Sequence, residues 1–250
     1  MAAEHAEHGP LDQFLVSRIY ELPELYGIDV SITNSALFML LAVFVATTLF
    51  VVAMRKRATI PGRAQSLAEI TYQFVHGIVE ENVGHAGQKY FPFIFTLFLF
   101  ILFVNLLGLI PGSFAPTSHI IITFGMGAFV FLAVMLIAII KKGPIGFIKH
   151  FVPAGVPIWM APLMLPIEMV SYLARPISLS IRLMANVAAG HTLIHVFAGF
   201  VVPLGLFGFL PIAFLTFMTG LEVFVSILQA YIFTLLSCMY LGEALHADHH

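Results

Sequence analysis

The chain has 250 residues, 60% of them hydrophobic and only 10% charged, whereas a soluble domain carries about 25% charged residues, so a membrane protein with several spans is predicted. Eleven Lys and Arg against 13 Asp and Glu give a formal net charge of −2, which argues against nucleic-acid binding. A single cysteine excludes an internal disulfide, and the absence of a GxxxxGK[ST] phosphate loop assigns any nucleotide chemistry to a partner.

Residues 1–29 form an acidic tail without the pattern of a signal or transit peptide. Residues 30–54 contain no charged side chain and are long enough for one transmembrane helix. A basic cluster follows directly: Arg55, Lys56, Arg57 and Arg63. Because basic loops stay in the cytoplasm, this end of the helix is expected to be cytoplasmic and the N-terminus periplasmic.

Apolar residues at helical spacing predict an amphipathic helix in the membrane interface over 65–86. Residues 90–141 carry no charge before Lys141 and are broken near the middle by Pro111 and Pro116, which predicts a transmembrane hairpin. Lys141 ends the hairpin, and its positive charge places this end on the same side of the membrane as the basic cluster.

A loop rich in Pro and Gly is expected over 143–157, followed by two long helical stretches, 158–200 and 203–245, and a cytoplasmic C-terminus. The fold class predicted is an all-α integral membrane protein, with residues 1–250 as one membrane domain. Unlike most apolar helices, the last two carry charged residues within hydrophobic sequence, and function is expected there.

A polar stripe runs along the first of these two stretches. At about 100° per residue, its members lie within roughly 40° of the direction of Arg182. They are Glu168, Ser171, Arg175, Ser178, Arg182, Asn186 and Ala189. Charged groups facing lipid cost several kcal/mol, so the stripe is expected to face protein or water.

His191 and His195 lie one turn apart and point away from Arg182. On the last stretch, Glu222, Ser226 and Gln229 share one face. If the two helices pack antiparallel, the histidines and Glu222 form a titratable cluster that passes protons through water.

Other interpretations of these groups stay open. Arg175 is equally well explained as a side chain that snorkels to the interface, and Glu168 as its neutralising partner. Two histidines one turn apart also suit a metal, but no carboxylate shares that turn, so neither a metal nor a cofactor is expected.

Three segments resemble subunit a of the F-type ATP synthase. Residues 176–196 (PISLSIRLMANVAAGHTLIHV) resemble its fifth helix, and residues 221–241 (LEVFVSILQAYIFTLLSCMYL) its sixth. Residues 105–118 (NLLGLIPGSFAPTS) resemble its hairpin turn. A histidine at 191 and an acid at 222 reverse the arrangement of many bacterial members and are similar to mitochondrial and alphaproteobacterial ones.

The resemblance implies a non-catalytic stator subunit that offers two offset aqueous half-channels to a rotor ring of hairpin subunits, each with one carboxylate. Arg182 matches the essential arginine, with Ser178, Asn186 and Gln229 near it. His191, His195 and Glu222 match the path from the N-terminal side, and Glu168 matches an acid on the opposite path.

The partners implied are the rotor ring, peripheral-stalk subunit b, the remaining ATP synthase subunits and membrane lipid, with no nucleic acid and no direct nucleotide binding. The location expected is a bacterial inner membrane, with the mitochondrial inner membrane as the alternative. A proton-coupled secondary transporter or channel is the second hypothesis, and a scaffold subunit without transport is the third.

Overall fold

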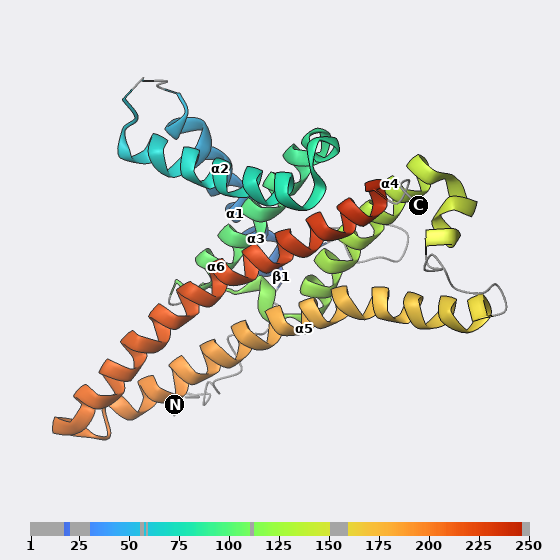
Figure 1. The fold of residues 1–250 in the computed structure, drawn as a ribbon. Helices are drawn as coiled ribbons and strands as arrows, with labels where there is room; N and C mark the ends of the chain where they lie inside the picture. The colour runs from blue at the N-terminus through green and yellow to red at the C-terminus, as the bar shows by residue number, and fades with distance from the viewer. Residues whose placement is uncertain are drawn as a thin grey trace.

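The computed structural model describes residues 18–20, 31–55, 58, 60–110, 113–150 and 160–246. Within them the chain is built from helices that pack into one membrane bundle (Figure 1). The main helices are α1 (Asn34–Ala53), α2 (Arg63–Val83), α3 (Phe91–Gly108), α4 (Ile120–His150), α5 (Ala161–Val201) and α6 (Phe209–His246). All but α2 include a stretch long and apolar enough to cross a membrane, which confirms the all-α membrane fold class.

A short antiparallel ribbon, not predicted from the sequence, precedes the first span. It pairs β1 (Arg18–Tyr20) with β2 (Ile32–Thr33). The hydroxyl oxygen of Thr33 then accepts a hydrogen bond from the amide of Ala36 at 3.3 Å, which caps α1. Ala42 and Ala46 on α1 are buried, while Phe44 is exposed, so small residues face the bundle and large ones face lipid.

α2 packs along the bundle through Val75, Val79 and Val83, which are all buried and one turn apart. It ends at Gly84, whose φ of 68° suits glycine. The C-terminal end of α6 lies directly against it, because a Cβ on Gly242 would overlap the carbonyl oxygen of Asn82. The end of α6 therefore lies at the same end of the bundle as α2.

The α3–α4 hairpin turns through η3 (Pro116–Ser118). Ser113 Oγ donates to the carbonyl of Leu107 at 2.8 Å and to that of Gly108 at 3.1 Å, which satisfies the end of α3. A Cβ on Gly108 would lie 3.2 Å from Ala115 Cβ, so the turn folds tightly back onto the helix.

α4 continues to His150, although a loop was expected from Gly143 onwards. Gly143 does interrupt the helix, with φ 72° and ψ 165°, and Pro144 follows it. Proline is compatible with the first position of a helix because its missing N–H is not needed there, so the helix resumes directly after the break.

α5 and α6 run side by side in opposite directions, joined by η5 (Gly205–Gly208), and form the long diagonal pair of Figure 1. They contain 41 and 38 residues, so at about 1.5 Å per residue each is about 60 Å long. Helices of that length fit a hydrocarbon layer of about 30 Å only if they are strongly tilted.

α4 lies against both long helices. A Cβ on Gly127 would lie 2.6 Å from Ser180 Oγ and 3.3 Å from the Pro176 carbonyl oxygen, so the glycine lets α4 approach α5 closely. The core joins α2, α3, α4, α5 and α6; residues from these helices in it include Val79, Ile94, Ile101, Val134, Leu179, Phe233 and Leu241.

Candidate functional site: polar groups between and beside α5 and α6

Arg182 lies near the middle of α5, with its side chain exposed. Ser178 and Asn186, one turn before and one turn after it, are also exposed, whereas Leu179 and Leu183 are buried. The ion pairs found between described residues do not include Arg182. The guanidinium is therefore presented on an open face of the bundle, in a helix flanked by apolar sequence.

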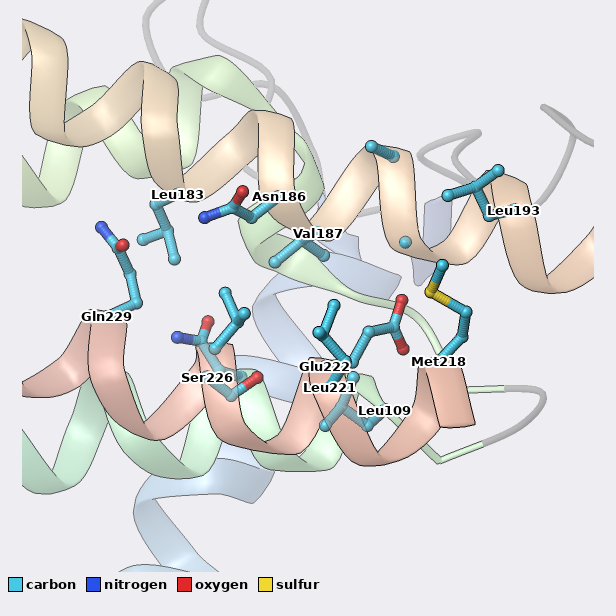
Figure 2. Close-up of a pocket in the computed structure, with 14 residues that line it drawn as sticks. Leu109, Leu183, Asn186, Val187, Leu193, Met218, Leu221, Glu222, Ser226 and Gln229 are labelled. Atoms are coloured by element: carbon cyan, nitrogen blue, oxygen red, sulfur yellow. The ribbon is translucent and has the colours of Figure 1, made fainter. Parts of the chain in front are cut away.

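A cavity of about 190 Å³ lies between α5, α6 and the end of α3 (Figure 2). Figure 2 shows Glu222 and Gln229 rising from α6 toward α5, and Asn186 at the facing side of α5. The cavity has room for several water molecules, because a single water molecule needs only about 10–15 Å³ of cavity volume. Its lining is Asn105, Leu109, Leu183, Asn186, Val187, Ala189, Gly190, Leu193, Met218, Leu221, Glu222, Val225, Ser226 and Gln229.

Polar atoms in this cavity have no protein partner among the described residues. These are both carboxylate oxygens of Glu222, Nε2 of Gln229, and the amide oxygen and nitrogen of Asn105. Glu222 is 9% exposed and Gln229 is 2% exposed, so bulk water does not solvate them fully. Buried polar groups need hydrogen bonds, so the cavity is suited to ordered water.

Gly190 determines where the Glu222 carboxyl group lies. A Cβ at this position would overlap Glu222 Oε1 and would lie 2.7 Å from Cδ and 3.1 Å from Cγ. The carboxyl group thus packs directly on the backbone of α5, at the residue before His191. The hydrogen atom of glycine leaves the space that the acid occupies.

His191 is half-buried beside this contact, and its imidazole hydrogen-bonds to the backbone of Gly108. The turn of the α3–α4 hairpin therefore reaches the same part of α5 as Glu222. His195, one turn further, is exposed and does not line the cavity. The antiparallel packing places Glu222 against Gly190, the neighbour of His191 in the chain, and His195 lies one turn further along α5.

A second polar group lies at the other end of the α5–α6 pair. Nη1 of Arg175 lies 3.6 Å from Oε1 of Glu243, and its guanidinium carbon lies 5.7 Å from the centre of the Tyr240 ring. Tyr172 meets Tyr240 edge to face at 4.9 Å. The partner of Arg175 is thus Glu243, and not Glu168 as one of the open interpretations suggested.

The remaining predicted residues lie on the outer side of α5. Ser178 is exposed and Glu168 is half-buried, and neither lines the cavity. No group of three or more His, Cys, Asp or Glu residues suited to a metal occurs in the part of the chain that the structure describes.

Several residues of these two groups were not found from the sequence. Asn105 belongs to the hairpin-turn motif, and as a single Asn in the apolar stretch 91–108 it is also a signal for a buried polar contact. Gly190 and Glu243 carried no signal of their own, because their contacts depend on how α5 and α6 are aligned.

A protein-family model described as ATP synthase A chain matches residues 36–242. Among curated proteins, the chain is 52% identical to ATP synthase subunit a of Magnetococcus marinus, over 95% of this chain and 93% of that protein. It is 47% identical to the subunit a of Ehrlichia ruminantium and 45% identical to that of Pelagibacter ubique. These two alignments cover 95% and 96% of this chain and 98% of each relative.

Proposed function

Because the chain belongs to the ATP synthase A chain family, and is thus a multi-pass membrane subunit that serves proton transport in ATP synthesis, we propose that it is the stator against which the proton-driven rotor turns. In this proposal it is non-catalytic, and ATP is made by other subunits. It exchanges protons with carboxylates of a rotor ring through two half-channels that open to opposite sides.

The exposed guanidinium of Arg182, in the middle of α5 and without an ion-pair partner among the described residues, is the observation that carries the proposal. A charge in this position is costly unless a protein with an opposite charge covers it. A ring that presents one carboxylate per subunit meets that requirement, and the exposed small residues Ser178 and Ala185 let its helices come close.

The two polar groups support separate half-channels. Along α5, Arg175 and Gly190 lie about 10 and 12 Å from Arg182 on opposite sides, at about 1.5 Å per residue. The cavity with Glu222, Asn105 and Gln229 lies toward the α3–α4 turn, on the side assigned to the periplasm. The Arg175 group lies toward the end of α6 that packs on α2.

Protons enter this scheme through the cavity. Water in it connects His195 and His191 at the outer edge with Glu222, and Asn186 and Gln229 extend the polar lining toward Arg182. On the opposite side, Glu168 and the Arg175 group line the path by which protons leave. Rotation carries each ring carboxylate from one path to the other.

Arg182 separates the two paths because it stays protonated and cannot relay a proton itself. A ring carboxylate about 4 Å away is attracted by roughly 4 kcal/mol at an effective dielectric near 20, so it gives up its proton when it arrives. Once the ring moves it into an apolar setting, ionisation is costly and the carboxylate has to be reprotonated first. A proton that crosses 100 mV supplies about 2.3 kcal/mol.

The partners in this proposal are the rotor ring, peripheral-stalk subunit b and lipid, in addition to the other ATP synthase subunits. Placing the basic cluster of residues 55–63 in the cytoplasm puts the N-terminus in the periplasm and the C-terminus in the cytoplasm. A bacterial inner membrane fits this assignment, and a mitochondrial inner membrane is the alternative.

The test uses the native complex with Arg182→Ala. The proposal predicts that ATP-driven proton pumping stops while ATP hydrolysis by the detached soluble sector continues. Retained pumping contradicts it and favours the alternative, a transporter or channel in which Arg182 binds an anionic substrate.

A further inference from the structure

A second cavity, of about 310 Å³, lies where α1, α2 and α3 meet near the basic cluster. Aromatic rings support its walls: Phe50 meets Phe95 edge to face at 5.6 Å, and Tyr72 meets Phe95 at 5.8 Å. The complete lining is Phe50, Met54, Ala68, Glu69, Tyr72, Gln73 and Phe95. A pocket with such walls is preformed and mainly apolar.

Cationic residues are close in the chain to residues that line this cavity. Arg55 follows Met54 of the lining, and Arg63 begins α2; both are exposed, and neither belongs to an ion pair between described residues. In the sequence, Lys56 and Arg57 stand between them. By sequence alone, these four residues carry a formal charge of +4.

Hydrogen bonds tie Ala58, which lies between Arg55 and Arg63 in the chain, to α2. Gln65 Oε1 accepts from the amide of Ala58 at 3.4 Å, and Gln65 Nε2 donates to the Ala58 carbonyl at 3.2 Å. The same Nε2 donates at 2.8 Å to Glu69 Oε1, the one acid of the lining. The acid is thereby hydrogen-bonded within α2, and the four basic residues outnumber it.

The cavity lies at the depth where lipid headgroups meet acyl chains. α1 is apolar as far as Ala53 and ends just before Arg55. On α2, Leu67 and Ile70 are 58% and 62% exposed, which suits a helix lying in the membrane interface with apolar side chains toward lipid. Met54 and Phe50 then mark the change from headgroup to hydrocarbon.

We infer that this cavity is a binding site for one anionic phospholipid. Arg55 and Arg63 hold its phosphate, since guanidinium groups form paired hydrogen bonds with phosphate oxygens. Part of one acyl chain fills the space between Phe50, Tyr72 and Phe95. A basic cluster directly beside a transmembrane helix attracts anionic lipid by about 1 kcal/mol per basic residue. A zwitterionic lipid has no net charge, so its attraction to the cluster is weaker.

The shape favours a lipid over a helix of another subunit. A helix with its side chains is about 10 Å across and does not fit into a cavity of about 310 Å³ between three helices. A flexible acyl chain does, and the apolar walls gain free energy from each methylene that they bury.

The experiment uses the assembled complex in nanodiscs that contain a trace of phosphatidylglycerol with a photoreactive acyl chain. After illumination, mass spectrometry locates the labelled peptides. Label is expected on the segments that carry Phe50, Tyr72 and Phe95. Unlabelled phosphatidylglycerol should compete for this labelling, and unlabelled phosphatidylcholine should compete much less.

Charge variants give the second measurement. Arg55→Gln and Arg63→Gln should each lower labelling about fivefold, the equivalent of about 1 kcal/mol. Lys141→Gln is the matched control, because Lys141 is exposed and assigned to the same membrane side but does not belong to this cavity. It should leave labelling unchanged. ATP-driven proton pumping shows that each variant has assembled.

Equal competition by the two lipids, or absence of label from the cavity walls, would overturn the inference for the wild-type complex even if no variant assembles. Equal labelling of the arginine variants and the control would overturn the role of the arginines. These outcomes are independent of the proton path, because the cavity shares no residue with the one that contains Glu222.

Discussion

The contact between Gly190 and Glu222 gives the sharpest prediction for the proton path. In Gly190→Ala, the new methyl group would overlap Oε1 of Glu222 and lie 2.7 Å from Cδ. Ordinary contacts between such atoms are about 3.5–4.0 Å, so the carboxyl group has to move by about 1 Å. The end of a glutamate side chain is flexible, and the helices therefore stay packed while the acid is displaced.

The expected loss is functional more than structural. Alanine favours a helix by about 1 kcal/mol over glycine, which offsets part of the overpacking cost of about 1–3 kcal/mol. A misplacement of 1 Å can lower a proton-transfer or catalytic rate by about 100-fold. We therefore expect Gly190→Ala complexes to assemble near the wild-type level and to pump protons about ten- to 100-fold more slowly.

The assay is ATP-driven proton pumping by inverted vesicles, followed with a pH-sensitive dye and normalised to the amount of assembled complex. Gly199→Ala is the matched control on the same helix, because a Cβ there meets nothing within 4 Å. Adding Glu222→Asp to Gly190→Ala should restore part of the flux, since the shorter side chain withdraws the carboxyl group from the new methyl. Wild-type flux in Gly190→Ala would show that the position of the Glu222 carboxyl group does not limit pumping, and so would a double variant that pumps no better than the single one.

Four further predictions concern α5, α6 and the end of α3. Arg182→Lys should lower pumping at least tenfold, because an ammonium group that the rotor ring covers can lose its proton; wild-type pumping would contradict this. Exchanging the relay residues, His191→Glu with Glu222→His, should preserve more flux than either single change, and a double variant no better than the singles would exclude the pairing. Asn105→Leu should reduce proton flux, because it removes two polar atoms that can hydrogen-bond to water in the cavity. Pumping assays will check this, with Asn105→Gln as the control that keeps the amide group. Glu243→Gln should leave the yield of complex near wild type, because its pair with arginine is about 40% exposed on both sides and contributes at most about 1 kcal/mol, so a strong loss of yield would disprove this estimate.

Helical spacing was sufficient to predict the face that carries Arg182. Ser178, Arg182 and Asn186 are exposed together, while Leu179 and Leu183 are buried, because a single continuous helix connects them. Pro176 lies within this helix without ending it. Hydropathy and the basic clusters likewise indicated the membrane helices, since apolar stretches of this length without charges rarely form anything other than a transmembrane helix.

Contacts between helices could not be predicted in the same way. That Arg175 pairs with Glu243, and that Glu222 packs on Gly190, depends on how far α6 is shifted along α5. No periodicity within one helix contains this information. The sequence suggested Glu168 as the partner of Arg175 because neighbours on one helix are the only pairs that spacing can reveal.

The loop expected after Gly143 shows a different limit. Composition rich in Gly and Pro indicates where a helix is interrupted, and Gly143 does interrupt α4. It does not tell how soon the helix resumes, because proline suits the first position of a new helix as well as a loop.

A side-chain-resolution density map of the assembled complex would show whether Arg182 faces a rotor carboxylate between two separate water paths. We expect a helix of the rotor ring opposite Arg182, with its carboxylate within about 4 Å of the guanidinium or joined to it by one water. A guanidinium that contacts only lipid, or that lies in one water-filled channel open to both sides of the membrane, would contradict it.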